Sequence, residues 1–283
     1  MHITRRRFIQ SAVTCAAGLS LGQKISMAAT PTKPPPIPLG FQLFTVRGAF
    51  EKDVPGTIKK LAQMGYAGVE FWAYIGTPDV WPKYSAADLR KILDDNGIKC
   101  CGMHMDPKAI SKENIQRTID NNQVLGNIYL NVAGAKDRVS SVDAIKQFAD
   151  YLIAAQAICA PHKMMVGYHA HSFDFDKIDG HFAWELLFQQ LPPDLNMQMD
   201  VGNSLSGNGD PVAMLKEFPG RTRTIHIKEY QDKTFDSPYY KEVFQLCETS
   251  SGTKWYIVEM GDADGTGFDV PREALEKLKR LGA

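Results

Sequence analysis

The sequence predicts an α/β protein whose single domain is a (β/α)8 TIM barrel. Eight short apolar runs alternate along the chain with segments that have the pattern of helices. This alternation predicts a parallel sheet that closes into a barrel. Each run also ends near a polar side chain, and the chemistry of such barrels takes place at the carboxyl ends of the strands. About 245 residues follow the N-terminal region, close to the usual size of one such barrel.

The apolar runs are the predicted strands, and their polar ends are the candidate site. The runs read GFQLFT, AGVEFW, CCGMH, IYLNV, MMVGYHAH, NMQMDVGN, RTIHIKEY and WYIVEM. In the same order they end near Gln42 and Thr45, Glu70, His104, Asn131, His169 and His171, Asp200, His226 and Lys228, and Glu259.

Glycines, prolines and capping residues mark the predicted helices. Ser85 and Asp88 form a capping-box pattern, and Gly65, Gly97 and Gly126 follow helical segments. The predicted helices cover residues 54–64, 86–96, 111–125, 142–159, 181–190, a short stretch from 210 to 219, 242–249 and 271–281. The loops at 72–84 and 230–240 follow barrel strands, so they are candidate lids or substrate walls, or else ordinary surface connections.

The N-terminal region has the three parts of an export signal. A twin-arginine pattern (TRRRFI, residues 4–9) precedes a weakly apolar stretch at 11–21, and small residues at 26–28 offer a cleavage site. The apolar stretch is too short to span a bilayer. We therefore expect a twin-arginine signal over 1–29, a proline-rich linker over 30–38, a barrel over 39–283 and a periplasmic location. The alternative is a basic N-terminus that is never cut.

Composition excludes several classes of partner. The formal net charge is zero and no basic stripe occurs, which argues against nucleic acid as a partner. No other segment is long and apolar enough to cross a membrane, so we expect no membrane association after signal removal. The four cysteines beyond the signal are Cys100, Cys101, Cys159 and Cys247, and we expect them to be buried apolar residues. The sequence leaves the oligomeric state open, with a homodimer possible.

The polar strand ends predict a metal centre. Side chains alternate across a strand, so His169 and His171 face the same way, as do His226 and Lys228. If this face is the inner one, ionisable residues from six strands meet at the barrel mouth. Burying so many of them without a cation would be costly, and a divalent metal coordinated by carboxylates and imidazoles removes the conflict.

These motifs give the chain a resemblance to a known family. GFQLFTVR, GYAGVEFW, GYHAHSFDF, MDVGN, IHIKE and WYIVEMGD resemble the xylose isomerase-like barrels of the sugar phosphate isomerase and epimerase group. The resemblance covers essentially everything after Leu39 and implies one divalent ion held by residues of strands five to eight. Carried over by position, the implied ligands are His169, Asp200, His226 and Glu259. Many members have a glutamate where this chain has His169, and His171 is an alternative ligand at that strand.

The histidine changes the expected chemistry. Two carboxylates and two neutral imidazoles leave a dication site neutral, and therefore a stronger Lewis acid than a site with three carboxylates. Mixed nitrogen and oxygen ligands suit Mn, Co, Zn or Fe better than Mg. The family's epimerases use two metal-bound glutamates as an acid–base pair, and this chain has only one glutamate at those positions.

We expect a sugar isomerase or epimerase that removes a proton next to a carbonyl. Glu259 is the expected base, and His171, Glu70 or His104 could return the proton. Lys228 is expected to bind or polarise a substrate oxygen, and Gln42, Phe44 and Trp72 to contact the sugar. The alternatives are that Glu70 is a buried ion-pair partner of Lys228 or Arg47, that His104 is a core histidine and that Trp72 is a packing residue.

Two other functions remain open at this point. A lyase or hydratase acting on 3-keto-glycosides would use the same proton removal and then expel the aglycone. A non-catalytic periplasmic sugar or metal binder is the alternative of another class. Abasic-site endonucleases share the barrel, but they need more metal ligands and a basic face, which the neutral composition does not provide.

Overall fold

The structure is a computed structural model that describes residues 36–282. The predicted export signal and residues 30–35 of the predicted linker lie outside the described residues, so both stay predictions.

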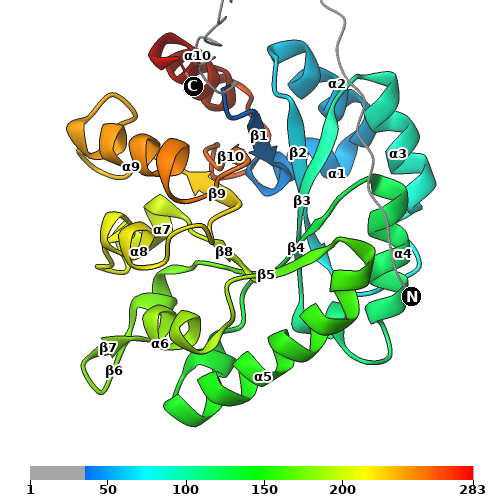
Figure 1. Ribbon diagram of the computed structural model, residues 1–283. Helices are drawn as coiled ribbons and strands as arrows, with labels where there is room; N and C mark the ends of the chain where they lie inside the picture. Colours follow the sequence, from blue (N-terminus) through cyan, green and yellow to red (C-terminus); the bar gives the residue numbers. More distant parts are fainter. Residues whose placement is uncertain (1–35, 283) are drawn as a thin grey trace, which may run out of the picture. The chain divides into compact units, whose positions relative to one another are not determined.

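Eight parallel strands form a nearly closed barrel, as the sequence predicts. Their order around the ring is β8-β5-β4-β3-β2-β1-β10-β9, and Figure 1 shows them at the centre of the molecule. The strands are β1 (Leu39–Gln42), β2 (Gly68–Tyr74), β3 (Lys99–Met105), β4 (Tyr129–Val132), β5 (Met165–His169), β8 (Asn196–Gln198), β9 (Thr224–Ile227) and β10 (Trp255–Val258). A parallel bridge between Asp200 and His226 joins the two ends of the sheet.

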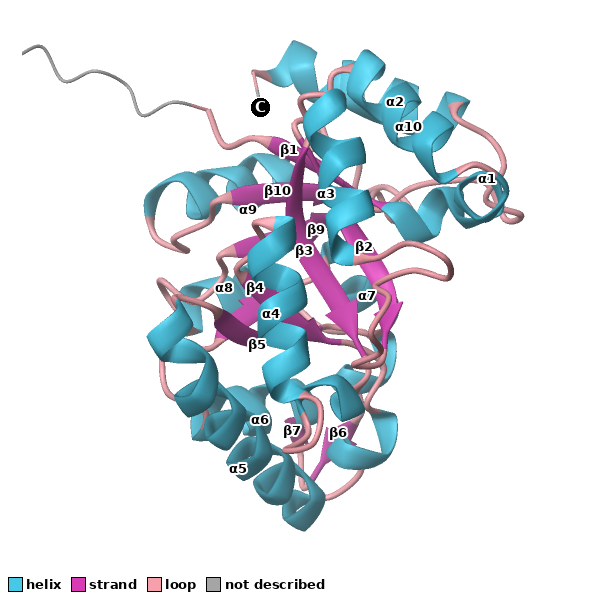
Figure 2. Ribbon diagram, turned by 90° about the vertical axis from the view of Figure 1, so that its right-hand side faces the viewer, coloured by secondary structure: helices cyan, strands magenta, loops and turns pink. Residues whose placement is uncertain are grey.

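Helices surround the barrel (Figure 2). They are α1 (Arg47–Lys52), α2 (Val54–Met64), α3 (Ala86–Asp95), α4 (Ile115–Leu125), α5 (Val142–Cys159), α6 (Ala183–Gln190), α7 (Val201–Ser206), α8 (Pro211–Glu217), α9 (Pro238–Thr249) and α10 (Asp269–Leu281). Short 3-10 turns follow several strands, among them Pro107–Ile110 after β3 and Lys136–Val139 after β4.

Local capping explains where these helices begin and end. Asp53 accepts the Gly56 N–H at the start of α2, and Gly65, in the left-handed conformation, ends it. Ser85 and Asp88 form the capping box predicted for α3.

Four predicted boundaries are wrong. The helix predicted from 181 begins at Ala183, because His181 and Phe182 (β7) pair with Lys177 and Ile178 (β6) in a small antiparallel hairpin. The helix predicted from 242 begins at Pro238, where the Ser237 side chain caps it. The helix predicted from 111 begins at Ile115, after the 3-10 turn. The loop predicted from residue 72 begins only after Tyr74, where β2 ends.

The barrel interior carries a polar layer beneath its carboxyl end. The side chains of Gln42, Glu70, Asn131, Asn196, Gln198 and Thr224 are almost completely buried and hydrogen-bonded to one another. Buried polar groups need such partners, and this network fixes the floor on which the site rests.

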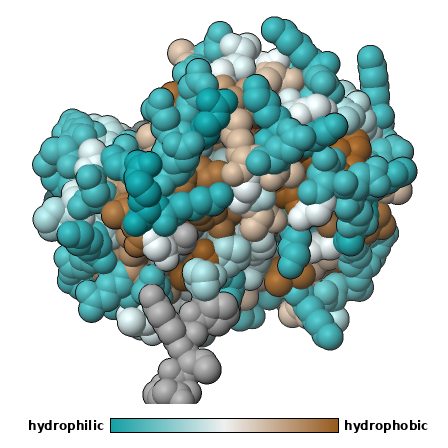
Figure 3. All heavy atoms as spheres, turned by 90° about the horizontal axis from the view of Figure 1, so that it is seen from above, coloured by the Kyte–Doolittle hydropathy of each residue, from teal (hydrophilic) through white to brown (hydrophobic). Residues whose placement is uncertain are grey.

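The face seen in Figure 3 is mostly hydrophilic, with smaller apolar areas between the polar side chains. Between residues 36 and 282, no helix combines the length and the hydropathy that a membrane span requires. Cys100, Cys101, Cys159 and Cys247 are free and buried, as expected.

Candidate metal centre

The structure brings together the four residues that the sequence predicts as metal ligands. His169 ends β5, Asp200 lies two residues after β8, His226 belongs to β9 and Glu259 follows β10. Each offers one ligand atom, and these atoms all lie within 4.8 Å of one another. His169, Asp200 and His226 are buried, whereas the Glu259 side chain keeps 15% of its surface exposed. Only Glu259 therefore opens the group to the barrel mouth.

Among the residues that the structure describes, two buried atoms of this group have no hydrogen-bond partner. They are Nδ1 of His169 and Oδ2 of Asp200. The other Asp200 oxygen, Oδ1, accepts the Asn203 N–H at 2.7 Å and so caps α7. A buried polar atom without a partner costs free energy, and a cation between the four residues would satisfy both. Two imidazoles and two carboxylates suit a divalent transition metal, so the donor set fits the ion that the resemblance implies.

His226 lies between two carboxylates. Its Nδ1 is 2.6 Å from Oε2 of Glu259, and its Nε2 is 2.6 Å from Oε2 of Glu70. Burial alone would lower the pKa of His226, but the two carboxylates outweigh burial and raise it to about 10. Burial would likewise raise the pKa of Glu259, but His226 and Lys228 lower it to about 2. The His226 imidazolium therefore supplies the positive charge that stabilises the Glu259 carboxylate in this structure.

Glu70 lies beneath the group rather than in the mouth. It is completely buried, and its carboxylate accepts from Nε2 of Gln42 at 2.9 Å and from Nε2 of Gln198 at 2.8 Å. Its ion-pair partners among the described residues are His104 and His226. The alternative that Glu70 pairs with Lys228 or Arg47 is therefore wrong. The geometry makes Glu70 a support for His226.

His104 has the contacts of a satisfied core histidine. Its Nδ1 lies 3.2 Å from Nε2 of Gln42, and its Nε2 lies 2.7 Å from Oε1 of Gln198. The ring stacks on His226 with the centroids 5.0 Å apart. His104, His169 and His226 also have ligand atoms within 4.8 Å of one another. The four-residue group is the better candidate, because it adds the Asp200 and Glu259 carboxylates, which a divalent cation needs as charge partners.

His171 lies just beyond the end of β5, beside the group. Its ring contacts His169 edge to face at 4.9 Å and stacks on Phe173 at 5.2 Å. Burial, together with the neighbouring His104, lowers the pKa of His171 to about 4, so the ring is neutral at pH 7. Its buried Nδ1 finds no hydrogen-bond partner in the described part of the chain. A neutral imidazole here could serve as a ligand or exchange a proton.

Lys228 reaches over the two carboxylates. Its Nζ lies 3.1 Å from Oδ1 of Asn203, 3.5 Å from Oδ2 of Asp200 and 3.7 Å from Oε1 of Glu259. A Cβ atom at Gly202 would lie 2.7 Å from the lysine Cδ, so the glycine leaves room for this side chain. Gly202 and Asn203 are contacts that the sequence analysis missed, although both lie within the MDVGN motif that contains Asp200.

A hollow of about 370 Å³, here called the Glu259 hollow, opens beside the group. Phe44, Arg47, Lys228 and Glu259 line it. Phe44 is 43% exposed, and Trp72, with its ring centroid 6.0 Å away, lies outside this lining. Of the four residues predicted to bind substrate, Phe44 and Lys228 line the hollow, and Gln42 and Trp72 do not. Gln42 is buried, and its amide is engaged by Glu70 and the Phe44 N–H.

Comparison with known proteins assigns the chain to a family. The family model described as "Xylose isomerase-like TIM barrel" matches residues 58–281. Among solved structures, a sugar phosphate isomerase/epimerase from Parabacteroides distasonis is 23% identical, with 89% of this chain and 95% of that chain covered and a TM-score of 0.74. No curated protein matches the sequence.

Two more distant structures carry different printed activities. The D-psicose 3-epimerase from Clostridium cellulolyticum is 12% identical over 86% of this chain and 99% of its own, with a TM-score of 0.64. The probable 3-DHS dehydratase AsbF from Bacillus anthracis is 11% identical over 86% of this chain and 98% of its own, with a TM-score of 0.62. Likeness at such identities shows the fold alone. The family model covers most of the sequence, and the chain belongs to the xylose isomerase-like TIM barrel family.

Proposed function

We propose that this protein is a divalent-metal-dependent sugar isomerase or epimerase that removes a proton next to a carbonyl. One observation carries the proposal: two imidazoles and two carboxylates converge at the barrel mouth, and two of their buried atoms lack a hydrogen-bond partner within residues 36–282. His169, Asp200, His226 and Glu259 would hold the ion, with Mn, Co, Zn or Fe favoured over Mg. When bound, the ion would supply Lewis acidity toward substrate oxygens and stabilise developing negative charge.

The side chains around the group have distinct roles in this proposal. Glu259 lines the hollow and is an ionised carboxylate, so it would accept the proton from the substrate carbon. Lys228 is a cation 3.7 Å from Glu259, and it would hold a substrate oxygen. His171, a neutral ring beside the group, would take up a proton and, as the imidazolium, return it to the substrate. Phe44 would cover the apolar face of the sugar. His104 and Glu70 have no free position facing the hollow, so in this proposal they position His226.

Metal analysis tests the ligand set directly. Bound metal per chain should fall to near zero in Asp200→Ala and in Glu259→Ala, because each change removes one of the four ligands. Asp232→Ala, at an exposed carboxylate in the loop after β9, is the matched control and should keep the wild-type content. If both ligand variants fold normally by circular dichroism and keep the full metal content, the assigned ligand set is wrong.

Isotope exchange tests the proton transfer. Candidate ketoses and 3-keto-glycosides are incubated with the enzyme in deuterated water. Deuterium should enter the carbon next to the carbonyl, and Glu259→Ala should abolish the exchange. Conversion of a substrate without deuterium at that carbon would contradict the proposal.

One observation favours a second candidate, a lyase or hydratase acting on 3-keto-glycosides. The strand-five position of the group is His169, so the two-glutamate relay of the family's epimerases is incomplete here. An elimination needs the same first proton removal but no second metal-bound glutamate. Product analysis separates the candidates, since elimination gives two fragments and isomerisation gives one. Tight binding without turnover across a broad keto-sugar panel would instead indicate a non-catalytic binder.

We also propose that the twin-arginine signal exports the protein to the periplasm. Export favours free sugars, keto-sugars or glycosides as substrates over phosphosugars, which are mostly cytoplasmic. A fusion of residues 1–38 to a reporter that folds before export should reach the periplasm. Replacing Arg5 and Arg6 together by lysine should retain the reporter in the cytoplasm.

A further inference from the structure

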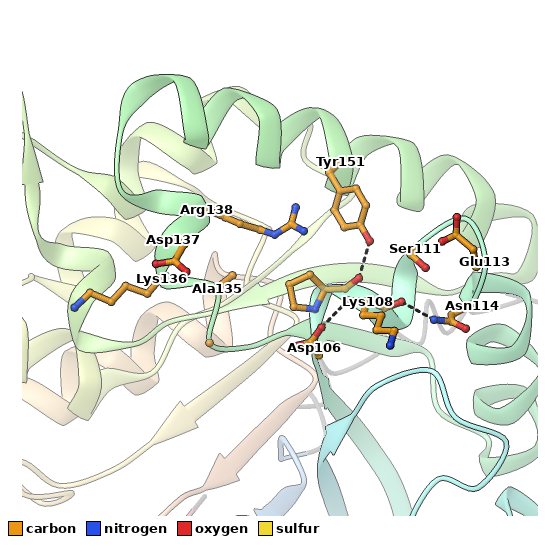
Figure 4. A pocket seen from close by; sticks show the side chains of 12 residues that line it. Asp106, Lys108, Ser111, Glu113, Asn114, Ala135, Lys136, Asp137, Arg138 and Tyr151 are labelled. Carbon is orange, nitrogen blue, oxygen red and sulfur yellow. Dashed lines mark hydrogen bonds between the residues drawn. The ribbon is translucent and has the colours of Figure 1, made fainter.

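A second and larger hollow opens at the same end of the barrel. It has a volume of about 580 Å³ and lies between the loops after β3 and β4 and the helix α5 (Figure 4). We call it the Arg138 hollow. Its volume is within the range of about 300–1,000 Å³ that is typical of small-molecule sites. Loops after barrel strands build the substrate sites of this architecture, so the position also suits a ligand.

The two hollows lie on different sides of the barrel mouth. In the ring order, β3 and β4 stand three or four places from β9 and β10, which precede Lys228 and Glu259. Phe44 and Arg47 follow β1, which stands two places from β3, and they line the near side of the Glu259 hollow. Asp106, which lines the Arg138 hollow, is two residues beyond His104 on extended backbone. Two extended residues span about 7 Å, so this hollow begins about one sugar ring from the histidines of the site.

Fixed side chains form one wall of the Arg138 hollow. The Tyr151 hydroxyl donates to the Pro107 carbonyl at 2.6 Å, which holds the ring against the loop after β3. The Arg138 guanidinium carbon lies 4.9 Å from the centre of the Tyr151 ring and 5.6 Å from that of Phe148. Figure 4 shows the guanidinium directed toward Tyr151. Gly134 adds open backbone, since a Cβ there would meet no atom within 4 Å.

The charges around this hollow balance. The lining includes three cations, Lys108, Lys136 and Arg138, and three acids, Asp106, Glu113 and Asp137. Among residues 36–282, none of these cations forms an ion pair with an acid, so their donors are free for a ligand. A lining that offers both donors and acceptors without net charge suits hydroxyl groups, which both donate and accept, better than a phosphate or a polyanion.

We infer that the Arg138 hollow is a subsite for a second sugar residue, so that the natural substrate is a disaccharide or longer glycoside. The reacting sugar lies in the Glu259 hollow, and the chain of sugar residues crosses the mouth toward α5. This inference rests on the proposed function and narrows its substrate class. It adds no chemical step, because Arg138, Lys108 and Tyr151 bind the distant sugar and stand apart from the proton transfer.

Calorimetric titration with unoxidised sugars tests the subsite without any turnover. The probes are methyl glucoside and the disaccharides cellobiose, maltose and trehalose, added to the metal-loaded full-length protein. At least one disaccharide should bind roughly tenfold more tightly than methyl glucoside, the increment expected of one or two hydrogen bonds to charged groups. Arg138→Ala and Lys108→Ala should each remove most of this difference and leave methyl glucoside binding unchanged. Arg280→Ala, at an exposed arginine of α10, is the matched control and should behave as wild type.

Equal affinity of wild type for the disaccharides and methyl glucoside would overturn the subsite, as would an unchanged preference in both variants. The deuterium experiment keeps this failure separate from that of the proposed function. Exchange into methyl 3-ketoglucoside without a disaccharide preference would remove only the subsite. Absence of exchange in every keto-sugar would remove the proton-transfer function.

Discussion

Oε2 of Glu70 lies 2.6 Å from Nε2 of His226, at the opposite edge of the ring from Glu259. The carboxylate accepts the Nε2 proton, so Nδ1 is the nitrogen directed at Asp200 and Glu259. Glu70 is itself held by the amide donors of Gln42 and Gln198. A metal-binding histidine is commonly fixed by a carboxylate on its other nitrogen, which sets both the tautomer and the ring orientation. The position of Glu70 on β2 thus connects the polar floor of the barrel to the candidate metal centre.

Glu70→Gln tests this relationship through metal affinity. A neutral amide accepts the His226 Nε2 proton less strongly than a carboxylate does. Its own NH2 group would also face the donating amides of Gln42 and Gln198, which then lose an acceptor. We expect the dissociation constant for Mn²⁺ or Zn²⁺ to rise about 10- to 100-fold. Competition with a chromogenic chelator measures it, and circular dichroism checks the fold. Affinity equal to wild type would show that the contact does not orient a ligand.

Phe44 and Trp72 allow substrate contact to be distinguished from packing. Phe44 is 43% exposed in the Glu259 hollow, whereas Trp72 packs on Trp81 and Phe50 with ring centroids 4.4 and 5.5 Å away. Phe44→Ala should raise KM roughly tenfold and leave Tm nearly unchanged, because little buried surface is lost. Trp72→Ala should instead lower Tm by several degrees, because it opens a gap in an aromatic cluster. Steady-state kinetics and thermal melts of both variants give the comparison, and the reverse pattern would exchange the two roles.

The barrel could be predicted from the sequence because its signals are local. Each strand is an apolar run, and helices such as α2 and α3 have their caps at the predicted places. Errors arise where pairing partners override local pattern. His181 and Phe182 look like the start of a helix, but they form β7 because Lys177 and Ile178 lie opposite them.

The candidate site could also be predicted from the sequence only in part. His169, Asp200, His226 and Glu259 stand at strand ends, and parallel strands must bring those ends to one face. The depth of a side chain along the barrel axis cannot be read from the local sequence in this way. Glu70 and His104 also stand near strand ends, yet the register of β2 and β3 places them one layer below the mouth, within reach of Gln198. The sequence therefore indicates which residues meet, and the register decides which of them face a substrate.

Asp174 predicts a pH dependence of stability. It is buried, and although its carboxylate accepts from the Tyr168 hydroxyl and the His171 N–H, burial raises its pKa from 3.8 to about 7. The folded state then holds a proton that the unfolded state releases between pH 4 and pH 7. The contribution of Asp174 to stability is thus present below about pH 4 and declines as the pH rises toward 7. Asp174→Asn should flatten this decline. Denaturant unfolding at intervals across that range measures it, and an identical slope in wild type and variant would contradict the assignment.

Removal of the metal should lower stability without unfolding the protein. In the absence of an ion the His226 imidazolium pairs with Glu70 and Glu259, so the group retains internal charge compensation. A cation that binds only the folded state contributes about 2.7 kcal/mol when its free concentration is about one hundred times Kd. We therefore expect a chelator to lower Tm by several degrees and Mn²⁺ or Zn²⁺ to restore it. His169→Ala should melt at the same temperature with and without metal, since it lacks a ligand. His181→Ala, at an exposed histidine, should keep the full shift. A metal-dependent shift of equal size in both variants would place the bound ion elsewhere on the protein.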